Sequence, residues 1–313
     1  MSLAMAGAAV FTSSTKTSYV VARDVEYLGT TLFVGGLAFV SLLWPAGAQV
    51  RRARVLLMTG WVIAFIGTLA ALVLEGAWAA QLPAGSALHT AVVKQVLATP
   101  FGREWAVKAL LWLLALIVLA DVLRRGQRAV TSLPWRLGAL AVGLAILRIS
   151  GLTGHTQDTA RPVIAQLADI VHLTAISVWI GGLTMLVVGV LPARRPDELR
   201  RVVPAFSLLA MGCITAIVAS GVMLAWRIAG SLHEVTSTTY GHLLLLKLAL
   251  VAVVLALGFG SKTWTAHRLD FAVVLRGEAG LVRPFVRSVA AETAVVVAVL
   301  SVASFLVTSD PGR

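Results

Sequence analysis

Apolar residues fill long stretches of this chain, and short segments rich in charged residues or proline separate them. A stretch of about 20 apolar residues is long enough to cross the hydrocarbon core of a bilayer as a helix. Runs of this length favour membrane helices over strands, which are shorter. The pattern predicts an all-α protein with eight spans, at approximately 25–44, 55–80, 105–122, 137–153, 163–191, 202–226, 243–260 and 286–308.

The composition agrees with a membrane protein and excludes other classes. Of the 313 residues, 58% are hydrophobic and 13% are charged, and the mean hydropathy of +0.90 excludes a soluble globular protein. A single cysteine, Cys213, cannot form an intrachain disulfide. The formal net charge is +12. Because the basic residues lie between the apolar stretches, this charge indicates membrane topology rather than nucleic-acid binding.

The basic residues predict the orientation in the membrane. Every connection from an odd-numbered to an even-numbered span contains a basic cluster, and the other connections carry isolated charges. The four clusters are Arg51, Arg52 and Arg54; Arg124, Arg125, Arg128 and Arg136; Arg194, Arg195, Arg200 and Arg201; and Lys262, Arg268, Arg276, Arg283 and Arg287. The positive-inside rule places them in the cytoplasm and both termini outside, with residues 1–24 as an external leader and 309–313 as a short external tail.

Two halves of the chain repeat the same spacings. The matching segments are Glu26-x6-Phe33-x-Gly35-Gly36-Leu37 with His172-x6-Trp179-x-Gly181-Gly182-Leu183, Phe101-Gly102-x5-Lys108 with Tyr240-Gly241-x5-Lys247, and Trp78 with Trp226. Close packing of membrane helices also selects glycine pairs, but three matches in register favour duplication. We therefore expect a single transmembrane domain of two parallel four-helix repeats, 25–150 and 151–308, with function where the halves face each other.

The histidines gather on the predicted external side, which holds five of the six: His89, His155, His172, His233 and His242. His155 lies in a short turn and His172 in the first turns of the fifth span, with Asp169 three residues earlier on the same helical face. Imidazole is the commonest metal ligand, and a carboxylate can bind metal or orient the ring. The sequence predicts a metal site of His155, His172 and Asp169, with His89 as a further ligand. The alternative is that these histidines only bond helix-end carbonyls or face solvent.

The available ligand types favour copper. Imidazole nitrogen suits copper, zinc, nickel and iron, and the Irving–Williams order places copper first among divalent ions at such a site. Neither Cys-x-x-Cys, His-Glu-x-x-His nor a phosphate-binding loop occurs, which argues against dithiol redox, metalloprotease and nucleotide-driven activities. We also find no nucleophile–base constellation, so the sequence predicts a protein that is not an enzyme.

Several ionisable residues lie inside the predicted spans, on the same side as the histidines: Glu26, Glu75, Lys108, Arg148 and Lys247. A charged side chain at membrane depth is costly unless a partner of opposite charge compensates it. We expect the carboxylates to pair with the lysines and arginines, which is favoured over a proton relay.

These features together resemble one known family. The motifs are the Gly154-His155-Thr156 turn, His172-x6-Trp179-x-Gly181-Gly182-Leu183, Tyr240-Gly241-x5-Lys247 and a last span containing Glu292. They resemble the copper resistance protein D (CopD) family of bacterial inner-membrane proteins, although Thr156 stands where the family turn commonly has Ala. The resemblance implies eight spans, copper bound at His155 and His172, copper transport across the cytoplasmic membrane, with import as its direction, and a separate copper-binding partner of the periplasmic CopC type.

Two alternatives keep the same topology. In the first, the protein is a b-type haem electron carrier with His172 as an axial ligand, although bis-histidine ligation needs two histidines facing each other inside the bundle. In the second, the protein is a scaffold that holds copper, as Cu(I) or Cu(II), for oxidase assembly without transporting it.

Overall fold

The computed structural model describes residues 3–152 except 80, 84, 86 and 87, residues 162–229 except 194, and residues 245 and 249. This part of the chain is helical and contains no strand. Its elements are α1 (Leu3–Leu42), a 3₁₀ turn (Pro45–Gln49), α2 (Arg51–Ala79), α3 (Thr90–Ala98), α4 (Pro100–Arg125), α5 (Gln127–Thr131), α6 (Leu133–Leu152), α7 (Pro162–Met185), a π-helical turn (Leu186–Val190), a 3₁₀ turn (Leu191–Ala193) and α8 (Pro196–Ala229).

Six of these helices are long and apolar enough to cross a membrane, and they confirm the first six predicted spans. Their apolar segments are Thr15–Leu42, Arg51–Ala79, Gly102–Arg125, Leu133–Gly151, Val163–Ala193 and Asp197–Leu224. The predicted spans 243–260 and 286–308 lie outside the described residues. The chain is therefore a multi-pass membrane protein.

The helix of the first span starts earlier than the sequence pattern predicts. The helix α1 begins at Leu3, and its candidate membrane segment includes Thr15–Leu42, so most of the predicted leader belongs to the same helix as the first span. Tertiary contacts hold this extension in place. Tyr19 stacks on Trp78 of α2 with ring centroids 5.7 Å apart, and the Thr15 hydroxyl donates a hydrogen bond to the Leu82 carbonyl at 3.1 Å.

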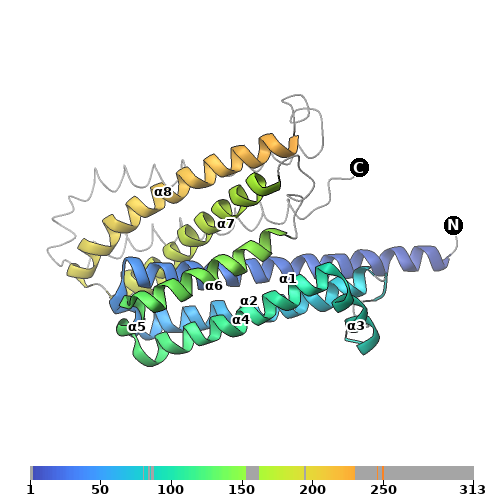
Figure 1. The fold of residues 1–313 in the computed structure, drawn as a ribbon, viewed down its shortest axis with the longest axis horizontal. Helices are drawn as coiled ribbons and strands as arrows, with labels where there is room; N and C mark the ends of the chain where they lie inside the picture. Colours follow the sequence, from blue (N-terminus) through green and yellow to red (C-terminus); the bar gives the residue numbers. More distant parts are fainter. Residues whose placement is uncertain are drawn as a thin grey trace.

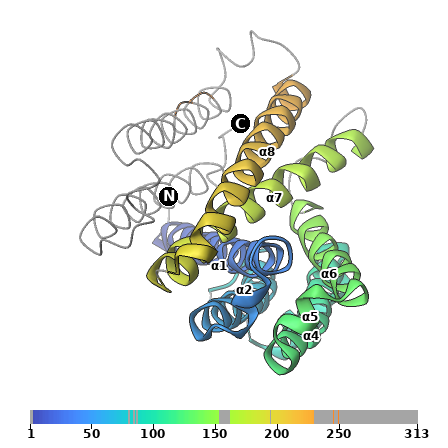
Figure 2. The same cartoon turned by 90° about the vertical axis from the view of Figure 1, so that its left-hand side faces the viewer.

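The helix α1 occupies the centre of the described bundle. It packs along α2 on one side and along α7 on the other, while α4 covers α2, α6 lies between α4 and α7, and α8 packs on α7 (Figures 1 and 2). We compared the most apolar 18-residue stretch of each span. In this stretch, 56% of the residues of α1 and 50% of those of α7 are buried, against 22–33% in the other four spans. The two helices that carry the repeated glycine motif are thus the most enclosed ones.

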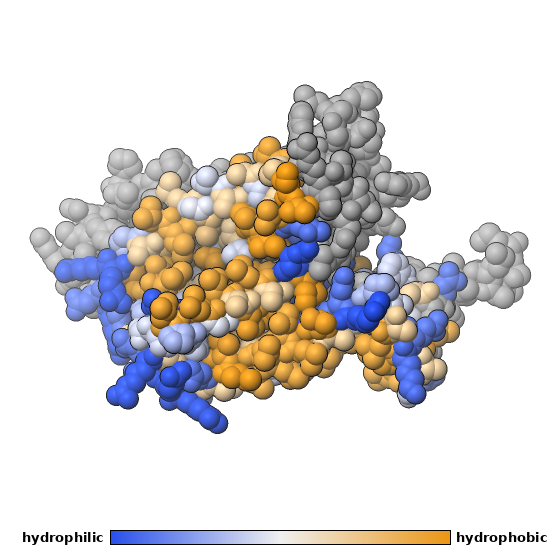
Figure 3. Space-filling view, in the orientation of Figure 1, coloured by the Kyte–Doolittle hydropathy of each residue, from blue (hydrophilic) through white to orange (hydrophobic). Residues whose placement is uncertain are grey.

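The surface has the polarity of a membrane protein. Large apolar side chains cover the middle of the bundle, and hydrophilic side chains gather at its ends (Figure 3). On α4, for example, Leu110, Leu113 and Ile117 are exposed. Such a band is stable only where hydrocarbon replaces water as the solvent.

The arginine-rich connections that the structure describes meet at one end of the bundle. The Arg136 guanidinium donates hydrogen bonds to the carbonyls of Val130 at 2.8 Å and Ser41 at 2.7 Å. The Trp44 indole donates to the Glu198 carboxylate at 3.1 Å, across 154 residues of sequence. These bonds join the connections that follow the first, third and fifth spans. The charge pattern predicts that these connections lie on the same side of the membrane.

Two glycines bring the backbones of α1 and α7 into direct contact. A Cβ atom on Gly35 would overlap the Ser177 carbonyl oxygen and lie 2.9 Å from the Gly181 Cα. A Cβ atom on Gly181 would overlap the Thr31 carbonyl oxygen and lie 2.7 Å from the Gly35 Cα. The contact is reciprocal, because Thr31 and Ser177 have the same sequence separation as Gly35 and Gly181. Small residues permit this closeness, as they do in many membrane helix pairs.

The next residue pair repeats this reciprocity. A Cβ atom on Gly36 would lie 2.8 Å from the Met185 side chain, and one on Gly182 would lie 3.4 Å from the Phe39 ring. Phe39 and Met185 again have the separation that relates the two glycine motifs. A twofold axis between two segments requires such reciprocal contacts.

A valine at this crossing should destabilise the protein. The Gly35→Val side chain would push α1 away from α7, and overpacking of this kind costs about 1–3 kcal/mol or more. We expect a clearly lower thermal unfolding temperature of the detergent-purified protein. Gly138→Val is the matched control, since no described heavy atom lies within 4 Å of a Cβ built at Gly138. Equal unfolding temperatures for the two variants would contradict the close contact.

Candidate functional site

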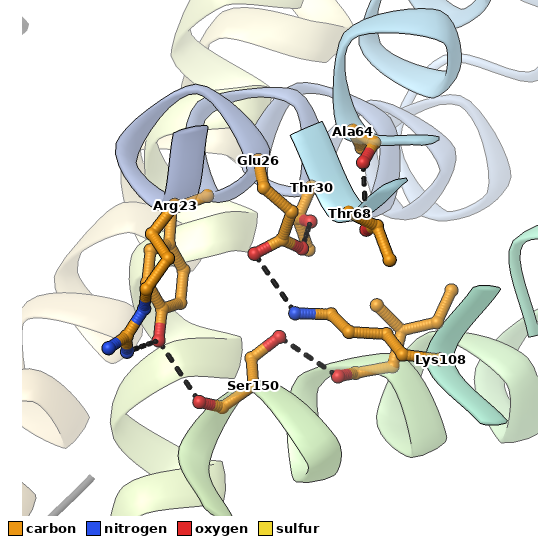
Figure 4. A network of polar contacts seen from close by, with 9 residues as sticks. Arg23, Glu26, Thr30, Ala64, Thr68, Lys108 and Ser150 are labelled. Carbon is orange, nitrogen blue, oxygen red and sulfur yellow. Dashed lines mark hydrogen bonds and ion pairs between the residues drawn. The ribbon is translucent and has the colours of Figure 1, made fainter. Parts of the chain in front are cut away.

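An ion pair between α1 and α4 is completely buried inside the bundle. The Lys108 Nζ lies 2.9 Å from the Glu26 Oε2, and the two side chains are 1% and 0% exposed (Figure 4). The other carboxylate oxygen of Glu26 accepts a hydrogen bond from the Thr30 hydroxyl at 2.7 Å. Gly67 of α2 lets the two helices approach closely at Glu26, because a Cβ atom there would lie 2.8 Å from the Glu26 Cα and Cβ atoms.

Aromatic rings complete the surroundings of the lysine. The Lys108 Nζ lies 4.6 Å from the centroid of the Trp105 ring and 5.8 Å from that of Tyr27. Both distances are within the range of cation–π attraction. The Tyr27 hydroxyl donates to the Ser150 carbonyl at 3.0 Å and accepts from the Arg23 guanidinium at 3.2 Å. The network therefore links α1, α4 and α6 (Figure 4).

A second carboxylate extends this cluster towards the N-terminal end of α1. Glu75 of α2 interacts with the Tyr19 hydroxyl and with the charge of Arg23. The cluster thus combines two carboxylates with two cations, so its formal charges cancel. Such cancellation offsets much of the cost of placing ionised groups at membrane depth.

The ion pair lies far from the arginine-rich end of the bundle. Glu26 precedes the end of α1 at Leu42 by about 24 Å, at roughly 1.5 Å per residue. The hydrocarbon core is only about 30 Å thick, so the pair lies at hydrocarbon depth, in the half opposite the arginines.

His172 occupies the position on α7 that matches Glu26 in the sequence repeat, and it faces α8. Its Nδ1 lies 3.0 Å from the Ser220 hydroxyl oxygen and 3.2 Å from the Ile217 carbonyl oxygen, and the ring is half-buried. A Cβ atom on Gly221 would lie 3.4 Å from the ring. A small residue at that position therefore lets α8 approach the imidazole.

These contacts determine which nitrogen of His172 carries the proton. The Ile217 carbonyl can only accept a hydrogen bond, and the Ser220 hydroxyl directs its own proton to the Ala216 carbonyl at 2.5 Å. Nδ1 is therefore the donor, and the lone pair of the neutral ring is on Nε2. Metal-binding histidines are commonly oriented in this way, by a hydrogen bond from the nitrogen that does not bind the metal.

The structure brings together few of the residues predicted to bind metal. The Asp169 carboxylate lies against Gly151 of α6, whereas His172 faces α8, so the two side chains contact different helices although they are three residues apart. His89 is exposed and immediately precedes α3, which packs on α2 and α4. His155 lies outside the described residues. Among the residues that the structure describes, no group of three or more His, Cys, Asp or Glu side chains is arranged to hold a metal ion.

The polar cluster was only partly predictable. Charges inside the spans predict pairing of carboxylates with basic residues, and the contact of Glu26 with Lys108 confirms that expectation. The participation of Tyr27 and Ser150 has no sequence signal, because tyrosine and serine occur throughout membrane helices without special roles. Only the packing of α6 against α1 identifies them.

Two family models match the chain. The model for the N-terminal domain of copper resistance protein D-like proteins matches residues 14–161, and the model for copper resistance protein D matches residues 200–306. A curated relative, the copper transport protein CutJ of Bacillus subtilis (strain 168), is 28% identical over 250 residues, which are 75% of this chain and 44% of CutJ. The chain thus spans less than half the length of this relative. No solved structure shows a significant match.

Removing one partner of the buried ion pair should destabilise the bundle strongly. Glu26→Gln leaves Lys108 without its counter-charge, and a buried charge without its partner costs about 3–5 kcal/mol. The double variant Glu26→Gln/Lys108→Met removes both charges and should recover most of that loss. Thermal unfolding in detergent measures both effects.

The exposed pair of Asp121 and Arg125 on α4 provides the control. Asp121→Asn should cost less than about 1 kcal/mol, because water and salt screen that pair. If Glu26→Gln and Asp121→Asn shifted the unfolding temperature equally, the buried pair would have no special structural role.

Proposed function

Because the chain belongs to the copper resistance protein D family, we propose that it transports copper across the membrane and binds the ion at a histidine site in the half of the bundle opposite the arginine-rich connections. The observation that carries this proposal is the orientation of His172, whose Nδ1 is held by Ser220 and Ile217 so that Nε2 carries the lone pair. A neutral imidazole fixed in this way is suited to copper.

The proposed ligands are His172 and His155, with Asp169 as a nearby carboxylate. Asp169 lies one helical turn before His172, and its position against α6 places negative charge on the side of α7 that faces the first half of the chain. His89 remains a candidate fourth ligand from its exposed position before α3. Transport needs no catalytic residues in this scheme, and the name of CutJ describes a transport function as well.

The repeat suggests why the chain holds one copper site rather than two. We treat the two halves as parallel four-helix repeats, which the reciprocal glycine contacts between α1 and α7 support. Glu26 then corresponds to His172, and Lys108 to Lys247, which lies outside the described residues. In the first half a carboxylate and a lysine neutralise each other, whereas in the second half an imidazole takes the place of the carboxylate and offers a metal ligand.

The arginine clusters support an orientation of the bundle in the membrane. With these connections in the cytoplasm of a bacterium, His172 lies in the external half of the cytoplasmic membrane. Copper then enters from outside, delivered by a separate copper-binding protein of the CopC type, and moves inward between the two halves. Import is the direction that the resemblance to the family implies.

Copper binding should depend on the two histidines. The wild-type protein purified in detergent should bind stoichiometric copper, and His155→Ala/His172→Ala should lower the affinity at least about 100-fold, since even residues that only orient a ligand contribute about 10–100-fold. Elemental analysis after incubation with Cu(I) or Cu(II) measures this. His233→Ala/His267→Ala is the matched control that should bind like the wild type. Copper retained by the first variant would overturn the site.

The same purified protein distinguishes the haem alternative from the copper proposal. A haem protein with His172 as an axial ligand would show a Soret band in its visible spectrum, which a copper transporter without haem lacks. A stoichiometric Soret band in the wild type that disappears in His172→Ala would replace the copper hypothesis.

Transport itself should be visible in sealed vesicles. We expect external copper to accumulate inside proteoliposomes in which the arginine-rich end faces the lumen, and His155→Ala/His172→Ala vesicles to show only the leak of empty liposomes. Protease accessibility of the basic connections would establish the orientation. Copper that binds stoichiometrically but does not accumulate would instead identify a scaffold that holds copper for another protein.

A further inference from the structure

Two hollows flank Trp135 at the arginine-rich end of the bundle. One, of about 200 Å³, lies between α1, α4, α6 and α7, and its walls include Phe33, Leu37 and Leu144. The other, of about 250 Å³, lies between α4 and α6. Trp135 and Val118 border both hollows, and the Trp135 indole donates a hydrogen bond to the Val118 carbonyl at 3.2 Å, which fixes the ring between them.

The volumes and walls suit hydrocarbon. An engineered protein cavity of about 150 Å³ holds benzene, so each hollow accommodates a segment of an acyl chain. Apolar side chains line most of the first hollow, and exposed Leu42 and Leu140 lead from it to the bilayer. Water would find few partners there, so a lipid tail is the natural occupant.

Each hollow also reaches an arginine. Arg136 borders the first hollow and Arg124 the second. The only acid at either rim among the described lining residues, Asp121, is already bonded to Arg125. Arg136 uses two of its five N–H donors on the carbonyls of Val130 and Ser41, so further donors remain. The rims therefore carry net positive charge beside apolar space.

From this arrangement we infer a binding site for one anionic phospholipid, with an acyl chain on each side of Trp135 and the phosphate group near Arg124 and Arg136. A lipid with a neutral headgroup would bind more weakly, because each basic residue near the membrane surface raises the affinity for an anionic lipid by a factor of about five. The arginines assigned to the phosphate lie at the end of the bundle opposite His172, whereas the first hollow extends along α7 to Thr174.

Native mass spectrometry of the full-length protein, titrated with phosphatidylglycerol or phosphatidylcholine, tests the site. We expect a preference of roughly tenfold or more for phosphatidylglycerol, and Arg124→Gln should weaken that lipid about fivefold. Arg51→Gln, an exposed arginine of α2 at the same end, is the charge-matched control and should change binding less than twofold. Gly138→Trp fills the second hollow, where a Cβ atom meets no described heavy atom within 4 Å, and should weaken both lipids.

Each outcome bears on the site. Unfolding temperatures in lipid-free detergent show whether the variants are folded, and Arg124→Gln, an exposed position, is expected to match the wild type. Equal binding of the two lipids by the wild type would overturn the headgroup assignment. Equal losses in Arg51→Gln and Arg124→Gln would show general surface attraction instead, and unchanged binding in Gly138→Trp would place the lipid elsewhere.

Discussion

Direct backbone contact between α1 and α7 sets the geometry on which the other helix positions depend. Gly35 and Gly181 leave no side-chain layer between the two helices, so each helix is enclosed by the other and by its remaining neighbours. In a membrane the hydrophobic effect does not drive helices together, and close van der Waals packing has to replace it. The pair α1–α7 provides that packing, while α2 and α8 cover its two flanks with the apolar surface that faces lipid.

This enclosure also explains why ionised groups can lie at hydrocarbon depth. Glu26 belongs to the most buried helix, and its carboxylate meets Lys108 from α4 and Thr30 from its own helix. Within the bundle, the ammonium group of Lys108 and the hydroxyl of Thr30 take the place of the water that would solvate the Glu26 carboxylate. The pairing also connects α4 to α1, and Gly67 lets the α2 backbone pack closely against α1 at Glu26. Together with the indole hydrogen bonds that Trp61 and Trp135 donate to carbonyls of α4, this polar contact specifies the position of α4.

The sequence predicts the spans well because hydrocarbon thickness demands a fixed length of apolar residues, and six of the eight can be compared with the structure. It does not predict that α1 continues N-terminal to residue 25, since hydropathy does not reveal that Tyr19 stacks on Trp78. The pairing of Glu26 with Lys108 follows from the cost of buried charge. By contrast, spacing on one helix suggests that Asp169 and His172 act together, whereas packing directs them to α6 and α8, and no local pattern contains that information.

The proposed repeat relates the buried ion pair of the first half to the proposed copper site of the second. In the first half of the proposed repeat, Lys108 neutralises the Glu26 carboxylate, so that group is already paired. The imidazole at the equivalent position of α7 is oriented by neutral oxygens of α8 rather than by a permanent charge. Under the proposed function, the first half of the bundle provides a charge-neutral frame, and the second half provides the imidazole at which we propose that copper binds.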